Sequence, residues 1–260
     1  MTGRSRAVEL ERNRADLRET RTDRVAVEEP LEIRLGFDDD GQRHTRSVSI
    51  TMRTPGDDED LALGFLLGES IVRTRDEVAV VKPCTGDNTV RVELEDAVTP
   101  DLERLQRHFY TSSSCGVCGK ASLEALRVQG CKRPGGEFRV SRKKLIEVPR
   151  RLRDAQAVFE QTGGLHAAAA FDAQGELIVV REDVGRHNAV DKVVGALLRE
   201  GRIPAGDLGL MVSGRASFEL VQKALDAAKP LLAAVSAPSS LAVELAQEFN
   251  VSLIGFLRGE

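Results

Sequence analysis

The second half of the chain repeats one pattern, in which a short apolar strand is followed by a polar turn and then by an amphipathic helix. Residues 176–181 fit the first strand, and residues 208–212, 231–235 and 251–257 fit the later ones. Near-continuous apolar strands that alternate with amphipathic helices are typical of a largely parallel sheet covered by helices. The pattern therefore predicts an α/β domain in this half of the chain.

The first half of the chain has a different pattern, with short alternating strands around one apolar helix. Alternation of apolar and polar residues predicts a hairpin of residues 31–35 and 47–52. A cluster of acids ahead of an apolar run predicts a helix start. We expect a small α+β domain over residues 25–110 and an α/β domain over residues 121–260. Residues 1–24 mix arginines with acids and hold few apolar residues, so we expect a disordered or weakly helical tail there.

Charge, apolar content and cysteine number exclude several classes of protein. The 260 residues carry a net charge of −4, which gives no global attraction to nucleic acid or to an anionic membrane. No apolar run approaches the roughly 20 residues of a membrane span, and the N-terminus lacks the apolar core of a secretory signal. Four cysteines in a chain of this length do not make a disulfide framework. We expect a cytoplasmic protein with no nucleic-acid or membrane partner.

Two of the four cysteines, Cys115 and Cys118, lie in a stretch rich in serine and glycine, residues 111–120. We interpret this stretch as a mobile, solvent-reachable loop that carries two thiols. The residues after it have helical character, so Cys118 and Lys120 would lie near a helix N-terminus, which favours the reactive thiolate. Three interpretations remain open at this point: half of a zinc site, a thioredoxin-like redox pair, or a loop whose thiolate accepts a sulfur atom and hands it on.

Polar turns follow three strands of the predicted sheet and precede helices. Ligands collect at the carboxyl ends of strands in such sheets, and the N–H groups of a helix start favour an anion. The turns hold Gly185, Arg186 and His187, then Ser213, Gly214 and Arg215, then Ser236, Ser239 and Ser240. Two arginines and several hydroxyl groups fit a polyphosphate or a nucleotide. His166 and His187, beside glycine-bearing turns, are candidate proton shuttles or ligand contacts, and Asn188 is expected to cap the helix after the first turn.

Four blocks of sequence resemble a known family. They are Ser-Ser-Ser-Cys-Gly-Val-Cys-Gly at 112–119, Thr-Gly-Gly-Leu-His at 162–166, Arg-Glu-Asp-Val-Gly-Arg-His-Asn-Ala-Val-Asp-Lys at 181–192 and Ser-Gly-Arg-Ala-Ser at 213–217. Together they resemble the formate dehydrogenase accessory sulfurtransferase family, also called FdhD or NarQ. The resemblance runs from about Glu29 to the C-terminus. It implies a small N-terminal domain followed by a cytidine-deaminase-like domain with a three-layer α/β architecture.

The resemblance also implies a function, namely a sulfur carrier with sulfurtransferase activity. Such a protein takes sulfur from a cysteine desulfurase as a persulfide and passes it to the molybdenum or tungsten bis(molybdopterin guanine dinucleotide) cofactor of formate dehydrogenase. Cys115 matches the persulfide-carrying cysteine and Cys118 its companion. We expect both proteins as partners, a homodimer, and no metal ligands. The implied pocket, including its GDP- or GMP-like end, comprises His166, Glu182, Asp183, Gly185, Arg186, His187, Asn188, Asp191, Lys192, Ser213, Gly214, Arg215, Ser217, Phe256, Leu257 and Arg258.

Two alternative functions come from other classes. A zinc nucleoside deaminase carries His-x-Glu followed by Pro-Cys-x-x-Cys. Here Ala168 stands where the glutamate would follow His166, and Ser114 precedes the cysteine pair in place of proline. We therefore reject this catalyst, although not its fold. The other alternative is a zinc-stabilised chaperone that binds the molybdenum cofactor without transferring sulfur, which stoichiometric zinc in the purified protein would favour.

Overall fold

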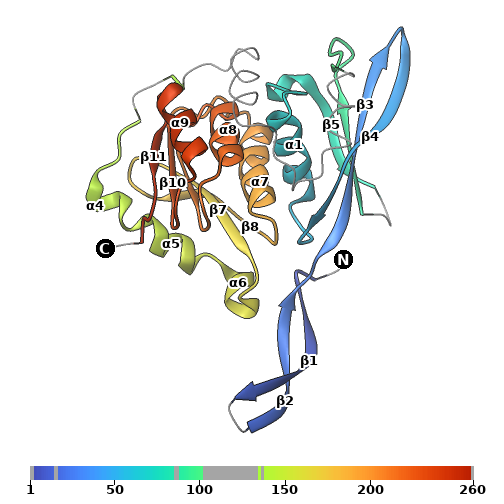
Figure 1. The fold of residues 1–260 in the computed structure, drawn as a ribbon. Coiled ribbons are helices and arrows are strands. Elements are labelled where there is room, and N and C mark those ends of the chain that lie inside the picture. Colours follow the sequence, from blue (N-terminus) through green and yellow to red (C-terminus); the bar gives the residue numbers. More distant parts are fainter. Residues whose placement is uncertain (1–2, 15–16, 85–87, 102–133, 136–137, 259–260) are drawn as a thin grey trace.

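The computed structural model of the protein describes residues 3–14, 17–84, 88–101, 134–135 and 138–258. These residues form a four-stranded sheet, a five-stranded sheet, helices that lie between and outside the sheets, and a protruding hairpin (Figure 1). The predicted thiol loop, residues 111–120, lies outside the described residues. No helix in the described ranges is long and apolar enough to cross a membrane.

The four-stranded sheet comes from the first half of the chain and has the strand order β4-β3-β6-β5. Its strands are β3 (Glu29–Asp39), β4 (Gln42–Arg53), β5 (Val78–Pro83) and β6 (Thr89–Leu94). β3 and β4 form the predicted hairpin, and its turn residues Asp40 and Gly41 both have positive φ values. Helix α1 (Asp58–Gly68) begins with three acids that oppose its macrodipole, and the short helix η1 (Arg75–Glu77) precedes β5.

The five-stranded sheet has the order β11-β10-β9-β7-β8. Its strands are β7 (His166–Phe171), β8 (Leu177–Asp183), β9 (Gly209–Val212), β10 (Leu231–Ala234) and β11 (Ser252–Ile254). β9, β10 and β11 are parallel, whereas β7 is antiparallel to β8 and to β9. The predicted parallel arrangement is confirmed for β9, β10 and β11, whereas both pairings of β7 are antiparallel, so the sheet is mixed.

Helices cover both faces of the five-stranded sheet (Figure 1). The inner face carries α7 (Arg186–Arg199), α8 (Phe218–Asp226) and α9 (Ser240–Glu248). The outer face carries α4 (Arg142–Leu145), α5 (Val148–Asp154) and α6 (Ala157–Thr162). Alternate residues of β7 face opposite sides: Ala168 and Ala170 join the inner hydrophobic cluster, and Ala167 and Ala169 join the outer one. The mixed α/β class is confirmed, while the cytidine-deaminase-like description stays a prediction.

Helices α1 and α7 touch backbone to backbone at two glycines. A Cβ on Gly64 would lie 1.9 Å from the carbonyl oxygen of Asp191, and a Cβ on Gly195 would lie 1.8 Å from that of Asp60. Only glycine permits this approach, because any side chain would collide with main-chain atoms. The two helices come from different halves of the chain, and the inner hydrophobic cluster runs through both halves without interruption.

The predicted disordered or weakly helical tail over residues 1–24 is wrong for the part that the structure describes. β1 (Ser5–Arg14) and β2 (Leu17–Ala26) form an antiparallel hairpin that projects from the body (Figure 1). A backbone hydrogen-bond ladder forms it, and few apolar side chains mark its strands in the sequence. At its base Arg4 donates to the carbonyl oxygen of Glu182 (3.0 Å) and lies 3.4 Å from the carboxylate of Asp57.

Candidate functional site

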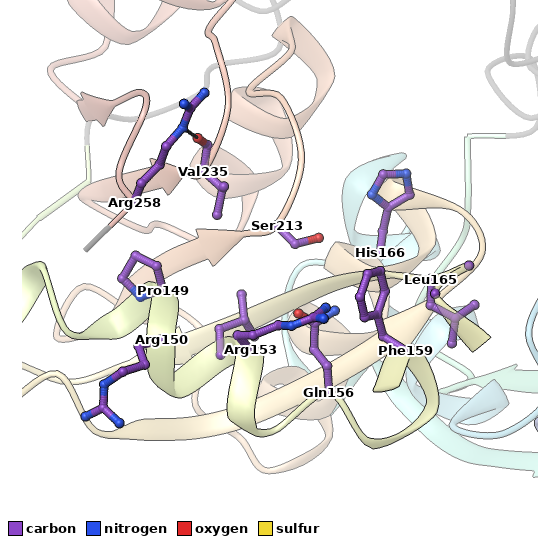
Figure 2. Close-up of a pocket in the computed structure, with 13 residues that line it drawn as sticks. Pro149, Arg150, Arg153, Gln156, Phe159, Leu165, His166, Ser213, Val235 and Arg258 are labelled. Carbon is purple, nitrogen blue, oxygen red and sulfur yellow. Dashed lines mark hydrogen bonds between the residues drawn. The ribbon is translucent and has the colours of Figure 1, made fainter. Parts of the chain in front are cut away.

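A cavity of about 660 Å³ lies at the edge of the five-stranded sheet where the parallel strands end (Figure 2). Ser213, Val235 and Arg258 line it from the segments after β9, β10 and β11, and His166 lines it from the start of β7. Residues of α5 and α6 line the outer side. This edge is where the sequence predicts a ligand, because the carboxyl ends of parallel strands meet there.

Three of the predicted cofactor residues line this cavity: His166, Ser213 and Arg258. The hydroxyl oxygen of Ser213 accepts a hydrogen bond from the backbone N–H of Ala167 (2.9 Å), so its own proton remains available to donate. Arg258 donates from Nε to the carbonyl oxygen of Val235 (3.4 Å). Burial, helped by the positive charge of Arg186, lowers the pKa of His166 and favours its neutral form.

A buried ion pair holds the turn that follows β8. Asp183 and Lys192 are both fully buried, and Lys192 Nζ lies 2.7 Å from the Asp183 carboxylate. Asp183 also accepts from the backbone N–H groups of Thr54 (3.1 Å) and Gly185 (2.8 Å), and Lys192 donates to the carbonyl oxygen of Thr54 (2.8 Å). Burial lowers the pKa of Lys192, and the charge of Asp183 opposes that shift. The pair therefore fixes the turn against the N-terminal half of the chain.

Two other predicted cofactor residues of the same block also bond inside the protein. Glu182 accepts hydrogen bonds from the backbone N–H groups of Val158 (3.0 Å) and Phe159 (2.8 Å), so its carboxylate caps the N-terminus of α6. Asp191 lies 2.6 Å from Lys223 Nζ, and burial raises the pKa of Asp191 while the charge of Lys223 opposes the rise. Neither carboxylate lines the cavity that the described residues form.

The prediction that Asn188 caps helix α7 is wrong. The helix begins at Arg186, with Gly185 at the N-cap position, and Asn188 lies within the first turn. Its amide donates to the carbonyl oxygen of Met52 (2.8 Å) and to the Asp183 carboxylate (3.0 Å). The Asn188 side chain therefore bonds to these two acceptors and does not cap α7. Met52 is 136 positions away in the sequence, so the local pattern could not predict that contact.

The other predicted cofactor residues lie in three segments beside the cavity. Gly185, Arg186 and His187 begin α7, and Gly214, Arg215 and Ser217 precede α8. A Cβ on Gly214 would lie 3.4 Å from Nδ1 of His166, so this second turn adjoins the cavity wall. Phe256 and Leu257 follow β11. Phe256 is 60% exposed and has a positive φ of 56°, whereas Leu257 packs in the outer hydrophobic cluster. Cys115 and Cys118 lie outside the described residues.

His187 lies where α7 and α8 begin, with its Nε2 atom 3.9 Å from the Glu219 carboxylate. Burial, together with the charges of Arg186 and Lys223, lowers the pKa of His187 to about 4. An unfolded histidine has a pKa of about 6.5. Between those two values the unfolded chain binds a proton that the folded chain does not, so this residue destabilises the fold as the pH falls.

His187→Gln should therefore reduce the loss of stability on acidification. The free energy of unfolding, measured by urea denaturation at several pH values, should fall less steeply for the variant than for the parent between about pH 6.5 and 4. His44→Gln, on the four-stranded sheet, serves as the matched control. Parallel curves for the parent and His187→Gln would contradict the burial of this imidazole.

The cavity also contains residues that the sequence interpretation missed, on the outer helices. Arg153 from α5 lies over the ring of Phe159 from α6, with Cζ 4.1 Å from the ring centroid. Gln156 lies between the two helices and lines the cavity (Figure 2). The local pattern predicts one helix over residues 152–161, but Ala155 ends α5 and Gln156 precedes α6. No motif marks this break, so nothing in the sequence could have assigned these side chains to a cavity.

Comparison with known proteins places the chain in a family. The model of the FdhD/NarQ family matches residues 26–260. The chain belongs to the FdhD/NarQ family. The sulfur carrier protein FdhD of Streptomyces avermitilis is 51% identical over 251 residues, which cover 92% of this chain and 86% of that protein. The sulfur carrier protein FdhD of Mycobacterium tuberculosis is 51% identical over 253 residues, covering 93% and 89%.

A solved structure shows that the fold is also shared. The crystal structure of a putative formate dehydrogenase accessory protein from Desulfotalea psychrophila matches with a TM-score of 0.78 at 24% sequence identity, covering 99% of this chain and 95% of that one. The predicted membership of the FdhD/NarQ family is thus confirmed. The family match begins at residue 26, so nearly all of the β1–β2 hairpin precedes it.

Proposed function

We propose that this FdhD/NarQ protein is a sulfur carrier and sulfurtransferase that supplies sulfur to the molybdenum or tungsten bis(molybdopterin guanine dinucleotide) cofactor of formate dehydrogenase. The observation that carries the proposal is its similarity, at about half of all positions over most of the chain, to proteins named sulfur carrier protein FdhD. In this proposal the sulfur donor is a cysteine desulfurase, and the protein acts in the cytoplasm as a homodimer.

The first chemical step is a sulfur exchange at Cys115. The Cys115 thiolate attacks the terminal sulfur of the donor's persulfide, a new S–S bond forms on Cys115, and the donor cysteine leaves as a thiolate. Such exchange is fastest when the attacking thiol is substantially ionised at ambient pH. Lys120 and the predicted helix after the loop favour ionisation of the cysteine pair.

The second step releases the sulfur to the bound cofactor, which is the substrate of the reaction. The Cys118 thiolate attacks Sγ of Cys115, the carried sulfur leaves as hydrosulfide, and a Cys115–Cys118 disulfide closes. The carried sulfur gains two electrons, which the cysteine pair loses, so the leaving atom has the oxidation state of a metal sulfide ligand. A cellular dithiol then reduces the disulfide by exchange.

The cavity at the sheet edge supports the cofactor half of the proposal. The guanidinium of Arg258 and the hydroxyl proton of Ser213 suit phosphate oxygens, and neutral His166 can accept or donate a proton. Arg186, the first residue of α7, and Arg215, in the turn before α8, add positive charge at the same edge of the sheet. The carboxylates of Glu182, Asp183 and Asp191 and the amine of Lys192 support the walls, because each of them is bonded inside the protein.

Sulfur loading tests the proposal directly. The purified protein is incubated with a cysteine desulfurase and cysteine, digested without reductant, and analysed by mass spectrometry. The peptide that contains Cys115 and Cys118 should gain one sulfur atom, which cyanide should remove. Stoichiometric zinc on the protein together with no gain of sulfur would instead support the zinc-stabilised cofactor chaperone.

A further inference from the structure

We propose that the outer helices α4 and α5 form a basic docking surface for an acidic face of the apoenzyme that receives the cofactor. This α4–α5 surface comprises residues 138–154, which hold seven basic and two acidic side chains and thus a net charge of +5. The whole chain has a net charge of −4, so its other residues carry −9 between them. The identity of the partner rests on the proposed function, whereas the charge of the surface does not.

The first observation is that the basic residues of α4 do not stabilise the fold. Arg142, Lys143 and Lys144 directly follow the N-cap residue Ser141, at the end of the helix where the backbone dipole favours acids. Within the described part of the chain no carboxylate pairs with any of the three, and Arg142 and Lys143 are exposed. Adjacent like charges without counter-charges repel one another. This uncompensated cluster favours the binding of an acidic partner.

The second observation is that the two arginines in the middle of α5 have different environments. Arg151 belongs to the fold, because it pairs with Glu147 (3.1 Å) and with Glu176. Arg150 lies 3.3 Å from Asp154, but the two side chains are 70% and 63% exposed. An exposed pair of this kind is weak, so a carboxylate of a partner can replace Asp154. Figure 2 shows the side chain of Arg150 pointing outward from α5.

The apolar side chains of α4 and α5 face the five-stranded sheet. Val148 and Leu152 are buried in the outer hydrophobic cluster, and Leu145 and Ile146 pack against it. A helix that binds a membrane surface combines basic groups with an apolar face that enters the lipid. Here that apolar face is used inside the protein. The α4–α5 surface therefore offers charge without an anchor for lipid.

The charge of the rest of the chain and the lack of a free aromatic ring argue against nucleic acid. A nucleic acid is charged along its whole length, so a strand on the α4–α5 surface would continue over the acidic remainder of the chain and be repelled. Phe138, the one aromatic residue of the surface, packs on Phe171 with its ring centroid 6.0 Å away, so it is not a platform for a base. An acidic patch on a folded protein is limited in extent, as the α4–α5 surface is.

The position of the surface indicates which protein docks there. Pro149, Arg150 and Arg153 of α5 line the cavity in which we propose that the cofactor binds. Helix α4 lies beside α5 on the outer face of the sheet (Figure 1). A protein docked on both helices is therefore next to the bound cofactor. In the proposed function the apoenzyme takes the cofactor from this cavity, whereas the desulfurase has to reach Cys115.

Association rates with cofactor-free formate dehydrogenase test the docking surface. The enzyme of the same organism, made in cells that lack the cofactor, is immobilised, and association is followed by biolayer interferometry. The ionic strength is about 0.01 M or about 0.15 M, which gives Debye lengths of about 30 Å and about 8 Å. The double variant Arg142→Glu with Lys143→Glu should associate about 10-fold more slowly at the lower ionic strength, and the difference should shrink at the higher one.

A second double variant controls for net charge. Arg46→Glu with Lys82→Glu makes the same change in charge at exposed positions of the four-stranded sheet, and it should associate within twofold of the parent rate. Urea denaturation tests for a structural role of the α4 residues. Arg142→Glu with Lys143→Glu should be at least as stable as the parent, because acids suit the first turn of a helix.

Three results would overturn the docking surface. They are a parental association rate for the α4 double variant, an equal loss of rate in both double variants, and a parent that does not associate with the apoenzyme at either ionic strength. In the last case, binding of the parent to single-stranded RNA or to phosphatidylserine vesicles would assign the surface to that other partner.

Sulfur loading separates this inference from the proposed function. The loading of Cys115 requires only the desulfurase and cysteine, and neither double variant should change it. A failed docking result therefore leaves the sulfur result intact. If the parent loads no sulfur, the rates of association with the apoenzyme still decide whether the α4–α5 surface is a docking site.

Discussion

Cys115→Ala should abolish sulfur loading and, with it, the activation of formate dehydrogenase. Alanine has no thiolate to attack the donor's persulfide, and under the proposed mechanism no other group can hold the transferred sulfur. The expected loss is therefore complete. It is measured as cyanide-labile sulfur on the purified protein and as formate dehydrogenase activity in cells that express only the variant. GDP binding should be unchanged, because Cys115 is not among the residues of the expected nucleotide pocket.

Two cysteine variants make this result specific. Cys84→Ala is the matched control, since Cys84 is a half-buried free thiol just after β5 on the four-stranded sheet, and both readouts should stay at parental level. Cys118→Ala should still load sulfur on Cys115 but should fail to activate the enzyme, because the attack that releases hydrosulfide is lost. Full activation of formate dehydrogenase by Cys115→Ala would remove the basis of the proposed function.

Asp183→Ala should destabilise the fold by about 3–5 kcal/mol, because it leaves the ammonium of Lys192 buried without a counter-charge. Lys192 has no exposed surface through which water could replace the carboxylate. The substitution also removes the acceptor for the backbone N–H groups of Thr54 and Gly185. Such a loss is a large fraction of the free energy of unfolding of a typical domain, which is roughly 5–15 kcal/mol. Urea denaturation at pH 7 measures it.

The double variant Asp183→Ala with Lys192→Met is the control for the charge argument. Removing both members of a buried ion pair is often far less costly than removing one, since no isolated charge remains. The double variant should therefore be more stable than Asp183→Ala alone. A single variant that loses less than about 1 kcal/mol, the range of an exposed pair, would show that water reaches Lys192.

Much of the architecture was predictable because strands and helices leave a periodic pattern in the sequence. The β3–β4 hairpin and the alternating strands and helices of the second half all follow such patterns. The β1–β2 hairpin was not predictable, because its strands are mostly polar and carry no apolar face. The break at Gln156 also left no signal, because its cause is tertiary: Glu182, more than twenty positions away, caps the helix that follows.

The candidate site was predictable in position but not in detail. The positions of the predicted helix starts and strand ends indicated the edge of the sheet at which the cavity lies. His166, Ser213 and Arg258, which were predicted from this pattern and from the family resemblance, line the cavity. The sequence alone could not show that the acidic residues of the 181–192 block bond inside the protein and do not face a ligand. The reason is that their partners are remote in sequence. Asp183, for example, bonds to Thr54, which is 129 positions away. Which residues touch the cofactor stays a prediction.

The crossing of α1 and α7 at Gly64 and Gly195 has a mechanical consequence. The main chains of the two helices are in contact at these glycines. If one helix slid or rotated on the other, a neighbouring side chain would replace the glycine and collide with a main-chain carbonyl oxygen. This contact resists a hinge motion between the two sheets. The two halves should unfold in a single cooperative transition. Neither half, expressed alone, should keep a fully buried hydrophobic core. A partner that docks on either half should therefore displace both sheets together.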